Sequence, residues 1–392
     1  MVNSLIAGST QPLTLHIVSP VSGNKADILI LTAGFGDGHN SAARNLSLAL
    51  EPHCPVLCCD PCAEGAPFIN ERLRSFYRGV TTHAPWLWRR IYLSTERQDF
   101  SKERLPMMRK PENRLHELIK EHQPKAIVST YPLYPYFLER IFQTDTPKVP
   151  VITVVTDSIE INAAWRKAPT DYWLVTDRQT RESLIRQGLP ETKLIETGFP
   201  VNPHFADLEP IRADDSLTPF RVLYFPTAKK PFVRRASREI LDAGPENIEL
   251  TIVLGRNLRK LYSRAKEIKD SYPGRVRILG WTKRVPELLT SHHLVVGKAG
   301  GATVHESLAA ACPMLIHHLV PGQEEGNLNL LRHLNGGHLA DTPGALSAHL
   351  REMLSDHATG WRSMKRNLAR HARPGAAHTA ANFILKQCGE QT

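Results

Sequence analysis

The chain of 392 residues lacks any run of 18 consecutive apolar residues, which excludes a helix that spans a membrane. Its first 24 residues contain no Lys or Arg and only a weak apolar run, so we expect a poorly ordered leader there and not a signal peptide. Internal repeats and low-complexity tracts are also lacking. At this length we expect two ordinary domains with full cores, and the absence of an export signal favours a cytoplasmic location.

Cysteine is scarce, with six residues, but four of them lie close together. The spacing of Cys54, Cys58, Cys59 and Cys62 raises the alternative of a structural zinc site, which requires four ligands in a closed tetrahedron. Against it, residues 56–60 have the pattern of a buried strand, in which Cys58 and Cys59 point to opposite faces. Reduced, buried thiols are therefore the favoured interpretation. Because no aspartate pair of the metal-holding kind occurs, we expect neither a metal nor another cofactor.

The chain also lacks the complete glycine fingerprint of a dinucleotide site. Residues 27–32 (DILILT) predict a strand, a glycine loop follows, and Asn40 or Ser41 caps a helix that runs to about Leu50. The third glycine of the fingerprint would fall at position 39, which is a histidine. Asp60 lies at a suitable distance downstream for a ribose contact, so a dinucleotide site remains an alternative.

Strand-like apolar segments alternate with helical ones along the chain, which predicts doubly wound α/β sheets. A stretch rich in proline and acidic residues, 205–219, reads as a linker. It would separate a first Rossmann-like domain at 25–204 from a second at 220–360, with a helical, basic segment at 361–392 after them. The further predicted strands lie at residues 56–59, 124–130, 151–156, 172–176, 193–197, 221–225, 249–254 and 276–279.

The segment 294–330 carries the clearest pattern of a site. A strand at 294–296, the Gly300-Gly301 turn, a helix from about Thr303 to Ala311 and a strand at 314–316 form a βαβ unit. Because a helix start presents free N–H groups and the positive end of a dipole, this turn can hold a diphosphate. The polar run 321–327 (PGQEEGN) follows at the carboxyl edge of the same sheet, where open α/β sheets bind ligands. A plain tight turn is the structural alternative.

These elements resemble the nucleotide-sugar site of glycosyltransferase family 28. The matching residues are the Lys298-Ala299-Gly300-Gly301 turn, the Glu306-Ser307-Leu308 helix and the Pro321-Gly322-Gln323-Glu324 loop with Asn327. The family includes monogalactosyldiacylglycerol synthases, processive diacylglycerol glucosyltransferases and the lipid II-forming N-acetylglucosaminyltransferase. The resemblance covers residues 27–340 and implies the GT-B fold, in which two Rossmann-like domains face a cleft and the final helix returns to the first domain.

The resemblance implies a UDP-sugar donor, with Glu306 on the ribose and with Gln323 and Glu324 on the sugar. The motifs Gly-Arg-Asn at 255–257 and Gly-Trp-Thr at 280–282 recur in the family's nucleotide domain, the second against the base. Thr303 and Glu306 also fit a capping box, in which the glutamate only satisfies the Thr303 N–H. The expected donor-binding residues are Gly38, Arg256, Asn257, Trp281, Lys298, Gly300, Gly301, Thr303, Glu306, Gln323, Glu324 and Asn327.

The loop 36–39 (GDGH) resembles the G-x-G-H loop of lipid-directed family members, which places His39 at the cleft. His39 is the predicted general base, because a neutral imidazole is available near pH 7; a polar loop residue that bonds the backbone is the alternative. Asp157, at the end of a strand, is predicted to assist it or to cap a helix. Helix dipoles with Lys298 or Arg256 would stabilise the leaving diphosphate without a metal. Relatives usually carry a histidine where Asn162 stands here.

The formal net charge of +10 is uneven, since residues 70–115 hold eleven Lys or Arg and five Asp or Glu. Segment 67–92 mixes these charges with aromatic residues at helical spacing, which predicts docking on an anionic membrane and entry of the lipid acceptor. Ordinary core packing is the alternative. The residues expected on this acceptor and membrane side are Phe76, Tyr77, Trp86, Trp88, Arg89 and Arg90.

The sequence therefore predicts an inverting hexosyltransferase that moves a hexose from a UDP-sugar to a lipid hydroxyl of the diacylglycerol type. Its place would be the cytoplasmic face of the cell membrane, with peripheral attachment. The alternatives are an epimerase-like nucleotide-sugar enzyme of the same fold, which would not need an aromatic and basic surface, and a transferase with another acceptor. Nucleic acid is suggested by charge alone, so we do not expect it as a partner.

Overall fold

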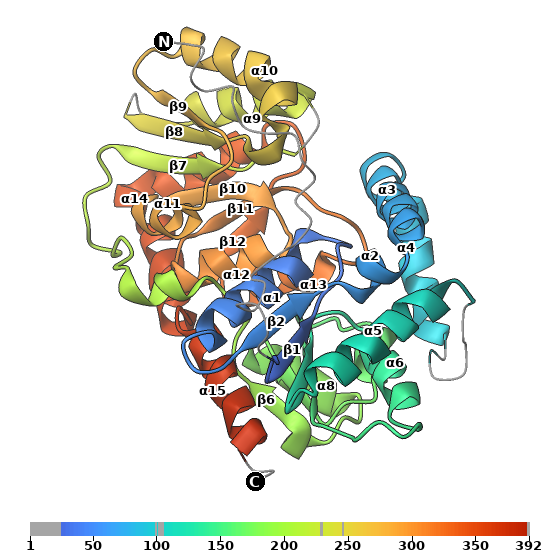
Figure 1. Ribbon diagram of the computed structural model, residues 1–392. Helices are drawn as coiled ribbons and strands as arrows, with labels where there is room; N and C mark the ends of the chain where they lie inside the picture. Colours follow the sequence, from blue (N-terminus) through green and yellow to red (C-terminus); the bar gives the residue numbers. More distant parts are fainter. Residues whose placement is uncertain (1–24, 99, 101–105, 228–229, 245–246, 390–392) are drawn as a thin grey trace.

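The computed structural model describes residues 25–389 except 99, 101–105, 228–229 and 245–246. The leader predicted at residues 1–24 lies outside the described residues. Two six-stranded sheets, each flanked by helices, form two lobes that follow one another along the chain (Figure 1). Because all the strand pairs within the described residues are parallel, the α/β prediction is confirmed.

The first sheet has the strand order β2-β1-β3-β4-β5-β6. Its strands are β1 (Ile28–Leu31), β2 (Val56–Cys59), β3 (Ala126–Ser129), β4 (Val151–Val154), β5 (Tyr172–Val175) and β6 (Leu194–Glu196). The helices of this lobe are α1 (Asp37–Leu50), α2 (Pro61–Gly65), α3 (Pro67–His83), α4 (Pro85–Ser94), α5 (Arg109–His122), α6 (Tyr134–Ile141), α7 (Ala163–Arg166) and α8 (Arg178–Arg186). The order changes direction between β1 and β3, so the ligand position expected for such a sheet is the loop after β1.

The second sheet has the order β12-β11-β10-β7-β8-β9, with its change of direction between β10 and β7. Its strands are β7 (Phe220–Tyr224), β8 (Ile248–Val253), β9 (Val276–Leu279), β10 (Leu294–Lys298), β11 (Met314–His318) and β12 (Gly337–Leu339). The helices of this lobe are α9 (Lys230–Leu241), α10 (Leu258–Ser271), α11 (Val285–Ser291), α12 (Gly301–Ala309), α13 (Glu325–His333) and α14 (Ala345–His371), and α15 (Ala376–Gly389) follows them in the chain. The Gly300-Gly301 turn therefore sits at this switch point.

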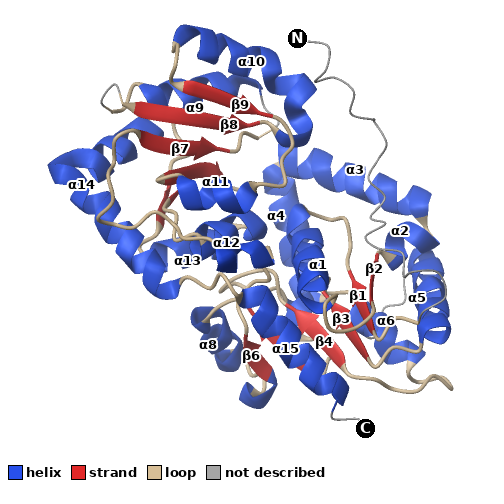
Figure 2. Ribbon diagram, turned by 60° about the vertical axis from the view of Figure 1, so that its left-hand side comes forward, coloured by secondary structure: helices blue, strands red, loops and turns tan. Residues whose placement is uncertain are grey.

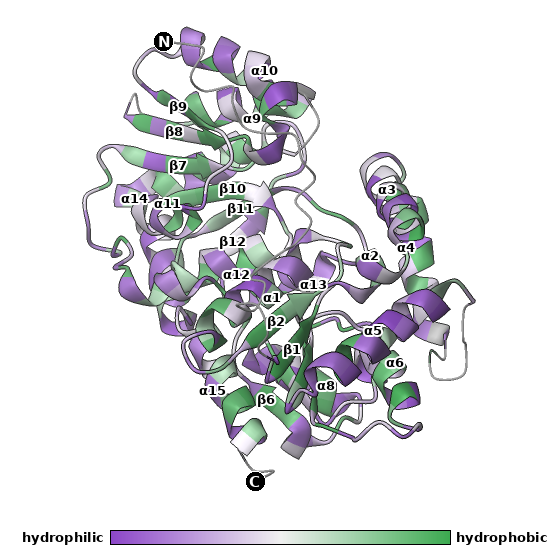
Figure 3. Ribbon diagram, in the orientation of Figure 1, coloured by the Kyte–Doolittle hydropathy of each residue, from purple (hydrophilic) through white to green (hydrophobic). Residues whose placement is uncertain are grey.

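The strands are apolar on both faces because helices cover both sides of each parallel sheet. In β1, Ile28 and Ile30 pack in one core cluster with α1 and α15, whereas Leu29 and Leu31 pack in another with α5 and α6. In Figure 3, strands such as β1 and β2 are mainly green, which marks hydrophobic residues, whereas the covering helix α5 is mainly purple, which marks hydrophilic ones. Cys58 and Cys59 fall into these two different clusters, on opposite faces as predicted. Within the described residues, no group of three or more His, Cys, Asp or Glu could hold a metal ion.

The last helix crosses from the second lobe to the first. Helix α14 packs in the core of the second lobe through residues such as the buried Trp361. Helix α15 then lies against α1 in the core of the first lobe. Figures 1 and 2 both show α15 beside the first sheet. The crossing segment is therefore α15, which begins at Ala376.

Helices α3 and α4 lie side by side at the margin of the molecule, next to α2 (Figure 1). We call them the α3–α4 hairpin, residues 67–94. Only Asn70 and Val80 of α3 are buried, and no residue of α4 is. None of the helices among the described residues is long and apolar enough to cross a membrane.

Candidate active site

His39 lies in the first turn of α1, directly after the loop that follows β1. Its Nδ1 is 3.0 Å from Thr156 Oγ1, and its ring makes an edge contact with Tyr131 at 5.3 Å. Burial lowers the pKa of His39 to about 4, since a charged imidazolium loses its hydration there. The imidazole is thus neutral at pH 7. In the tautomer that donates Nδ1–H to Thr156, Nε2 keeps the lone pair that a base needs.

Asp157 follows β4 and shares a neighbour with His39. The Trp165 indole N–H donates to Asp157 Oδ2 at 2.9 Å, and the Trp165 ring lies 5.8 Å from the His39 ring. Burial raises the pKa of Asp157 to about 6, with a smaller contribution in the same direction from the charge of Glu324. The structure therefore brings two groups that titrate in unusual ranges to one place, on the first lobe's side of the junction.

The start of α12 lies against the first lobe. A Cβ added at Gly301 would come within 2.7 Å of the Thr156 carbonyl oxygen, so this position requires glycine. Helix α12 begins at Gly301, two residues earlier than the sequence predicted, with Gly300 as its N-cap, and Thr303 lies inside the helix. Because Thr303 is not the N-cap, the capping-box alternative for Glu306 is wrong.

The Glu306 carboxylate meets no hydrogen-bond donor within the described part of the chain. Burial raises its pKa to about 7, which the charge of Arg44 partly offsets. A half-buried carboxyl group without a protein partner is suited to accept hydrogen bonds from a ligand. This arrangement supports the ribose role that the family resemblance implies.

The polar loop comprises residues 319–324 between β11 and α13, and the carboxylate of its last residue, Glu324, bonds both to the loop backbone and to a side chain outside the loop. Glu324 is buried, and it accepts from Lys298 Nζ at 2.9 Å and from the Val320 backbone N–H at 3.0 Å. The negative charge of Glu324 raises the pKa of Lys298. Both Glu324 oxygens are therefore engaged, whereas the half-exposed Lys298 ammonium keeps one side free for an anion.

Other predicted donor residues are placed in different ways. Asn327 donates from Nδ2 to the Ala299 carbonyl at 3.0 Å and so ties α13 to the Gly300 turn. Arg256 and Trp281 lie exposed after β8 and β9, and Asn257 ends the short helix 255–257. Gly38 is the second residue of α1, next to His39. The structure thus joins Lys298 to Glu324 and joins Asn327 to the backbone of the turn before Gly300, but it shows no contact of Arg256 or Trp281 with these residues.

The α3–α4 hairpin divides its aromatic residues between two sides. Phe68, Phe76 and Trp86 are 87%, 55% and 63% exposed, so core packing does not account for them. Tyr77 and Trp88 instead pack edge to face at 4.8 Å, and the Tyr77 hydroxyl donates to Gln323 of the polar loop at 3.0 Å. The exposed Arg90 lies 6.0 Å from the Trp86 ring.

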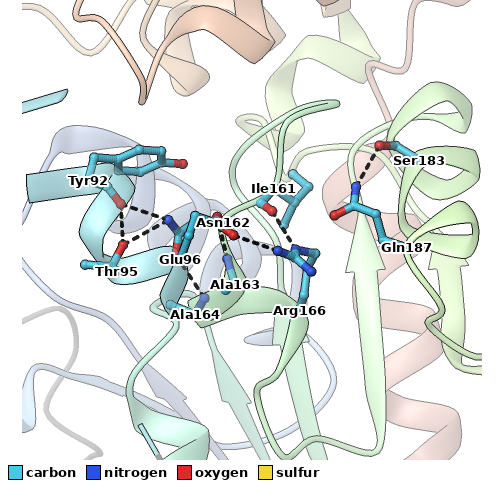
Figure 4. Close-up of polar contacts among 10 residues, drawn as sticks. All are labelled: Tyr92, Thr95, Glu96, Ile161, Asn162, Ala163, Ala164, Arg166, Ser183 and Gln187. Atoms are coloured by element: carbon cyan, nitrogen blue, oxygen red, sulfur yellow. Dashed lines mark hydrogen bonds and ion pairs between the residues drawn. The ribbon is translucent and has the colours of Figure 1, made fainter. Parts of the chain in front are cut away.

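The sequence did not reveal what Asn162 does. Its side chain caps α7 by accepting from Ala164 N–H, and it donates to Thr95 Oγ1 and to the Tyr92 carbonyl (Figure 4). Glu96 adds bonds to the Ala163 N–H and to Arg166. Asn162 therefore anchors the end of the hairpin to the first lobe. No sequence signal other than its departure from the family pattern pointed to it.

Comparison with known proteins shows what this chain is similar to in sequence. The family model for monogalactosyldiacylglycerol (MGDG) synthase matches residues 39–201. A processive diacylglycerol beta-glucosyltransferase of Bacillus licheniformis is 27% identical over 311 residues, which are 77% of this chain and 79% of that protein. One from Bacillus subtilis is 24% identical and covers 92% of this chain and 95% of its own. The predicted family resemblance is confirmed.

Solved structures extend the likeness to the fold. Acinetobacter baumannii MurG has a TM-score of 0.61 at 13% identity and covers 92% of this chain and 99% of its own. A UDP-GlcNAc 2-epimerase from Neisseria meningitidis, bound to UDP-GlcNAc, has a TM-score of 0.57 at 10% identity and covers 93% and 99%. At such low sequence identities, the similarity shows that the fold is shared and does not show a shared function. The two-lobed GT-B prediction is confirmed.

Proposed function

We propose that this protein is an inverting, metal-independent hexosyltransferase that moves a hexose from a UDP-sugar to a diacylglycerol-type lipid. The observation that carries the proposal is the meeting of two sets of groups at the junction of the lobes. His39 and Asp157 come from the first lobe, and the start of α12 with Lys298 comes from the second. The names of the relatives, which act on diacylglycerol, support the choice of acceptor.

The donor diphosphate would lie at the start of α12, where backbone N–H groups and the helix dipole face it. Glu306 would accept from the ribose hydroxyls, and Gln323 would face the hexose. The acceptor hydroxyl attacks C1 of the hexose while His39 Nε2 takes its proton. The new C1–O bond forms as the bond from C1 to the diphosphate breaks, and UDP leaves. Lys298 and the α12 dipole stabilise the charge that grows on the leaving diphosphate.

The α3–α4 hairpin would place this junction at an anionic membrane surface. Its outer side exposes Phe68, Phe76 and Trp86 together with basic residues, a mixture suited to the boundary of lipid headgroups. We therefore propose peripheral attachment at the cytoplasmic face of the cell membrane. The lipid hydroxyl would enter beside the hairpin.

The proposal is tested by product analysis with labelled UDP-glucose, UDP-galactose and UDP-N-acetylglucosamine, each with and without diacylglycerol in anionic vesicles. A labelled glycolipid that forms only when diacylglycerol is present is the expected result. Conversion of one free UDP-sugar into another without lipid would instead establish the epimerase alternative. A Glu306→Ala variant should bind UDP more weakly by about 1–3 kcal/mol, the worth of hydrogen bonds to a charged group. Unchanged UDP affinity would remove Glu306 from the donor site.

A further inference from the structure

The hairpin of the first lobe contacts the polar loop of the second lobe and Glu325, the first residue of α13. Tyr77 donates to Gln323 Oε1 at 3.0 Å, and Arg89 Nε lies 3.8 Å from Glu325 Oε1. At Gly322, the residue before Gln323, an added Cβ would come within 3.2 Å of the Tyr92 ring. The loop that is expected to face the donor sugar is therefore backed by an element on the acceptor side.

Tyr77 is well placed to act as a fixed hydrogen-bond donor. Its ring packs edge to face against Trp88 at 4.8 Å and against Phe35 at 6.3 Å. Burial raises the pKa of Tyr77, since phenolate would lose its hydration, so the hydroxyl keeps its proton at physiological pH. The base of the hairpin is tied to α7 through Asn162 and Glu96 (Figure 4). The position of this hydroxyl is thus set by the first lobe.

In this structure the hydrogen bond from Tyr77 turns the oxygen end of the Gln323 carboxamide toward the hairpin. A glutamine side chain ends in an amide whose last torsion is broad, so a lone Gln323 would present its oxygen or its nitrogen. Because Oε1 accepts from Tyr77, the two N–H donors of Nε2 remain for a ligand. Hydroxyl oxygens of a hexose are suitable acceptors for them.

We propose that Tyr77 is a positioning residue for the donor sugar, which holds the Gln323 carboxamide with its N–H groups toward the hexose. This inference rests on the proposed function, because Gln323 is taken there to face the sugar. The hexose site would then be completed by both lobes. The nucleotide part of the donor would be bound without any help from Tyr77.

The test compares UDP with the UDP-hexose that the full-length protein uses. A Tyr77→Phe variant keeps the ring and removes only the hydroxyl. Its affinity for UDP should stay within twofold of wild type, while its affinity for the UDP-hexose should fall roughly tenfold, with KM rising more than kcat falls. A Tyr262→Phe variant serves as the control, because Tyr262 lies exposed on α10. A general loss of structure would weaken both ligands and lower the melting temperature.

A second variant makes the assignment sharper. In a Gln323→Ala background, Tyr77→Phe should cause no further loss of UDP-hexose affinity, because the two residues act through one contact. Two results would overturn the inference and leave the proposed function intact. One is equal UDP-hexose affinity of Tyr77→Phe and wild type, and the other is a double variant whose loss of affinity equals the sum of the two single losses in free energy. Failure of the wild type to bind any UDP-hexose more tightly than UMP would overturn the proposed function, and the inference with it.

Discussion

At the scale of single residues, burial has opposite effects on the two candidate catalytic groups. It lowers the pKa of His39 to about 4 and raises that of Asp157 to about 6. Both shifts widen the pH range over which the uncharged form predominates, which is the neutral imidazole for His39 and the protonated carboxyl for Asp157. At pH 7 the imidazole is neutral and Asp157 is mostly ionised. The two groups are thus ready to take a proton and to stabilise the imidazolium that results.

Replacing His39 by glutamine should lower turnover by about 10²–10⁴-fold, the usual worth of a general base. Donor affinity should stay nearly unchanged, because His39 is assigned to the acceptor hydroxyl. Steady-state kinetics with UDP binding measured in parallel checks this, with the exposed His53→Ala as the control. A loss of less than tenfold would make His39 a structural residue, and Asp157 would become the candidate base.

The raised pKa of Asp157 predicts how its contribution to stability depends on pH. With a folded pKa of about 6 and an unfolded value near 3.8, the folded protein holds this proton more tightly. The contribution is therefore fully present below about pH 4 and is lost as pH rises through 6, by up to about 3 kcal/mol. An Asp157→Asn variant lacks this loss.

Urea unfolding of wild type and Asp157→Asn at several pH values between 4.5 and 8 tests this prediction. The variant should gain in stability relative to wild type as pH rises. A difference in the free energy of unfolding that does not change with pH would show that the carboxyl group titrates normally.

Which residues contact each other was only partly predictable. Glu306 and Gln323 could be assigned to a donor because their spacing fits a family pattern. The Tyr77–Gln323 bond joins residues 246 positions apart, and no periodicity reports on such a pair. The bonds of Glu324 to Lys298 and Val320 were missed for the same reason, since they depend on how the loop closes.

At the scale of elements, glycine sets how closely the lobes approach. At Gly326, the second residue of α13, an added Cβ would lie 1.9 Å from the Ser158 carbonyl oxygen. Nearby, Ser158 Oγ is 2.9 Å from His305 Nε2 of α12, whose ring stacks on Phe199 of the first lobe. Asn329 donates to Glu160 at 2.8 Å. These contacts hold α12 and α13 against the loop after β4, which carries Asp157.

A Gly326→Ala variant should therefore separate α13 from this loop and weaken the contact between the lobes. We expect a loss of about 1–3 kcal/mol in the free energy of unfolding, typical of an inserted methyl group in a packed site. Turnover should also fall at temperatures at which the variant is still folded. Thermal unfolding and turnover are measured together. Gly375→Ala is the control, because a Cβ there meets no atom within 4 Å. Equal behaviour of the two variants would contradict the close contact.

At the scale of the whole molecule, the architecture followed from the sequence more readily than the site did. Parallel strands that are buried on both faces appear in the sequence as short apolar runs, and the alternation of such runs with helical segments predicts doubly wound sheets. The strand β12 was missed because its three residues, Gly337–Leu339, are too short to show a pattern. The start of α12 was placed too late, since Gly301 looked like a turn residue and not a helical one. Helix ends depend on local contacts, here the close approach of Thr156.

The outer side of the α3–α4 hairpin predicts how the molecule meets a membrane. Exposed Phe68, Phe76 and Trp86 each offer apolar area that can enter the headgroup region, worth about 1–2 kcal/mol apiece. Basic residues near an anionic surface add about 1 kcal/mol each. The electrostatic part must weaken as salt screens it. Binding should therefore require both the aromatic side chains and a negative surface.

Co-sedimentation with phosphatidylglycerol and phosphatidylcholine vesicles at two salt concentrations measures this binding. We expect strong binding to phosphatidylglycerol at low salt, weaker binding at high salt and little binding to phosphatidylcholine. A Phe68→Ser, Trp86→Ser variant should lose tenfold or more in affinity, and because both side chains are largely exposed, it should keep the fold. Tyr262→Ser removes an exposed aromatic residue on α10 and should bind like wild type. Equal binding to both lipids, or full retention by the Phe68→Ser, Trp86→Ser variant, would show that the hairpin does not dock on membranes, because the two features that set it apart would then contribute nothing.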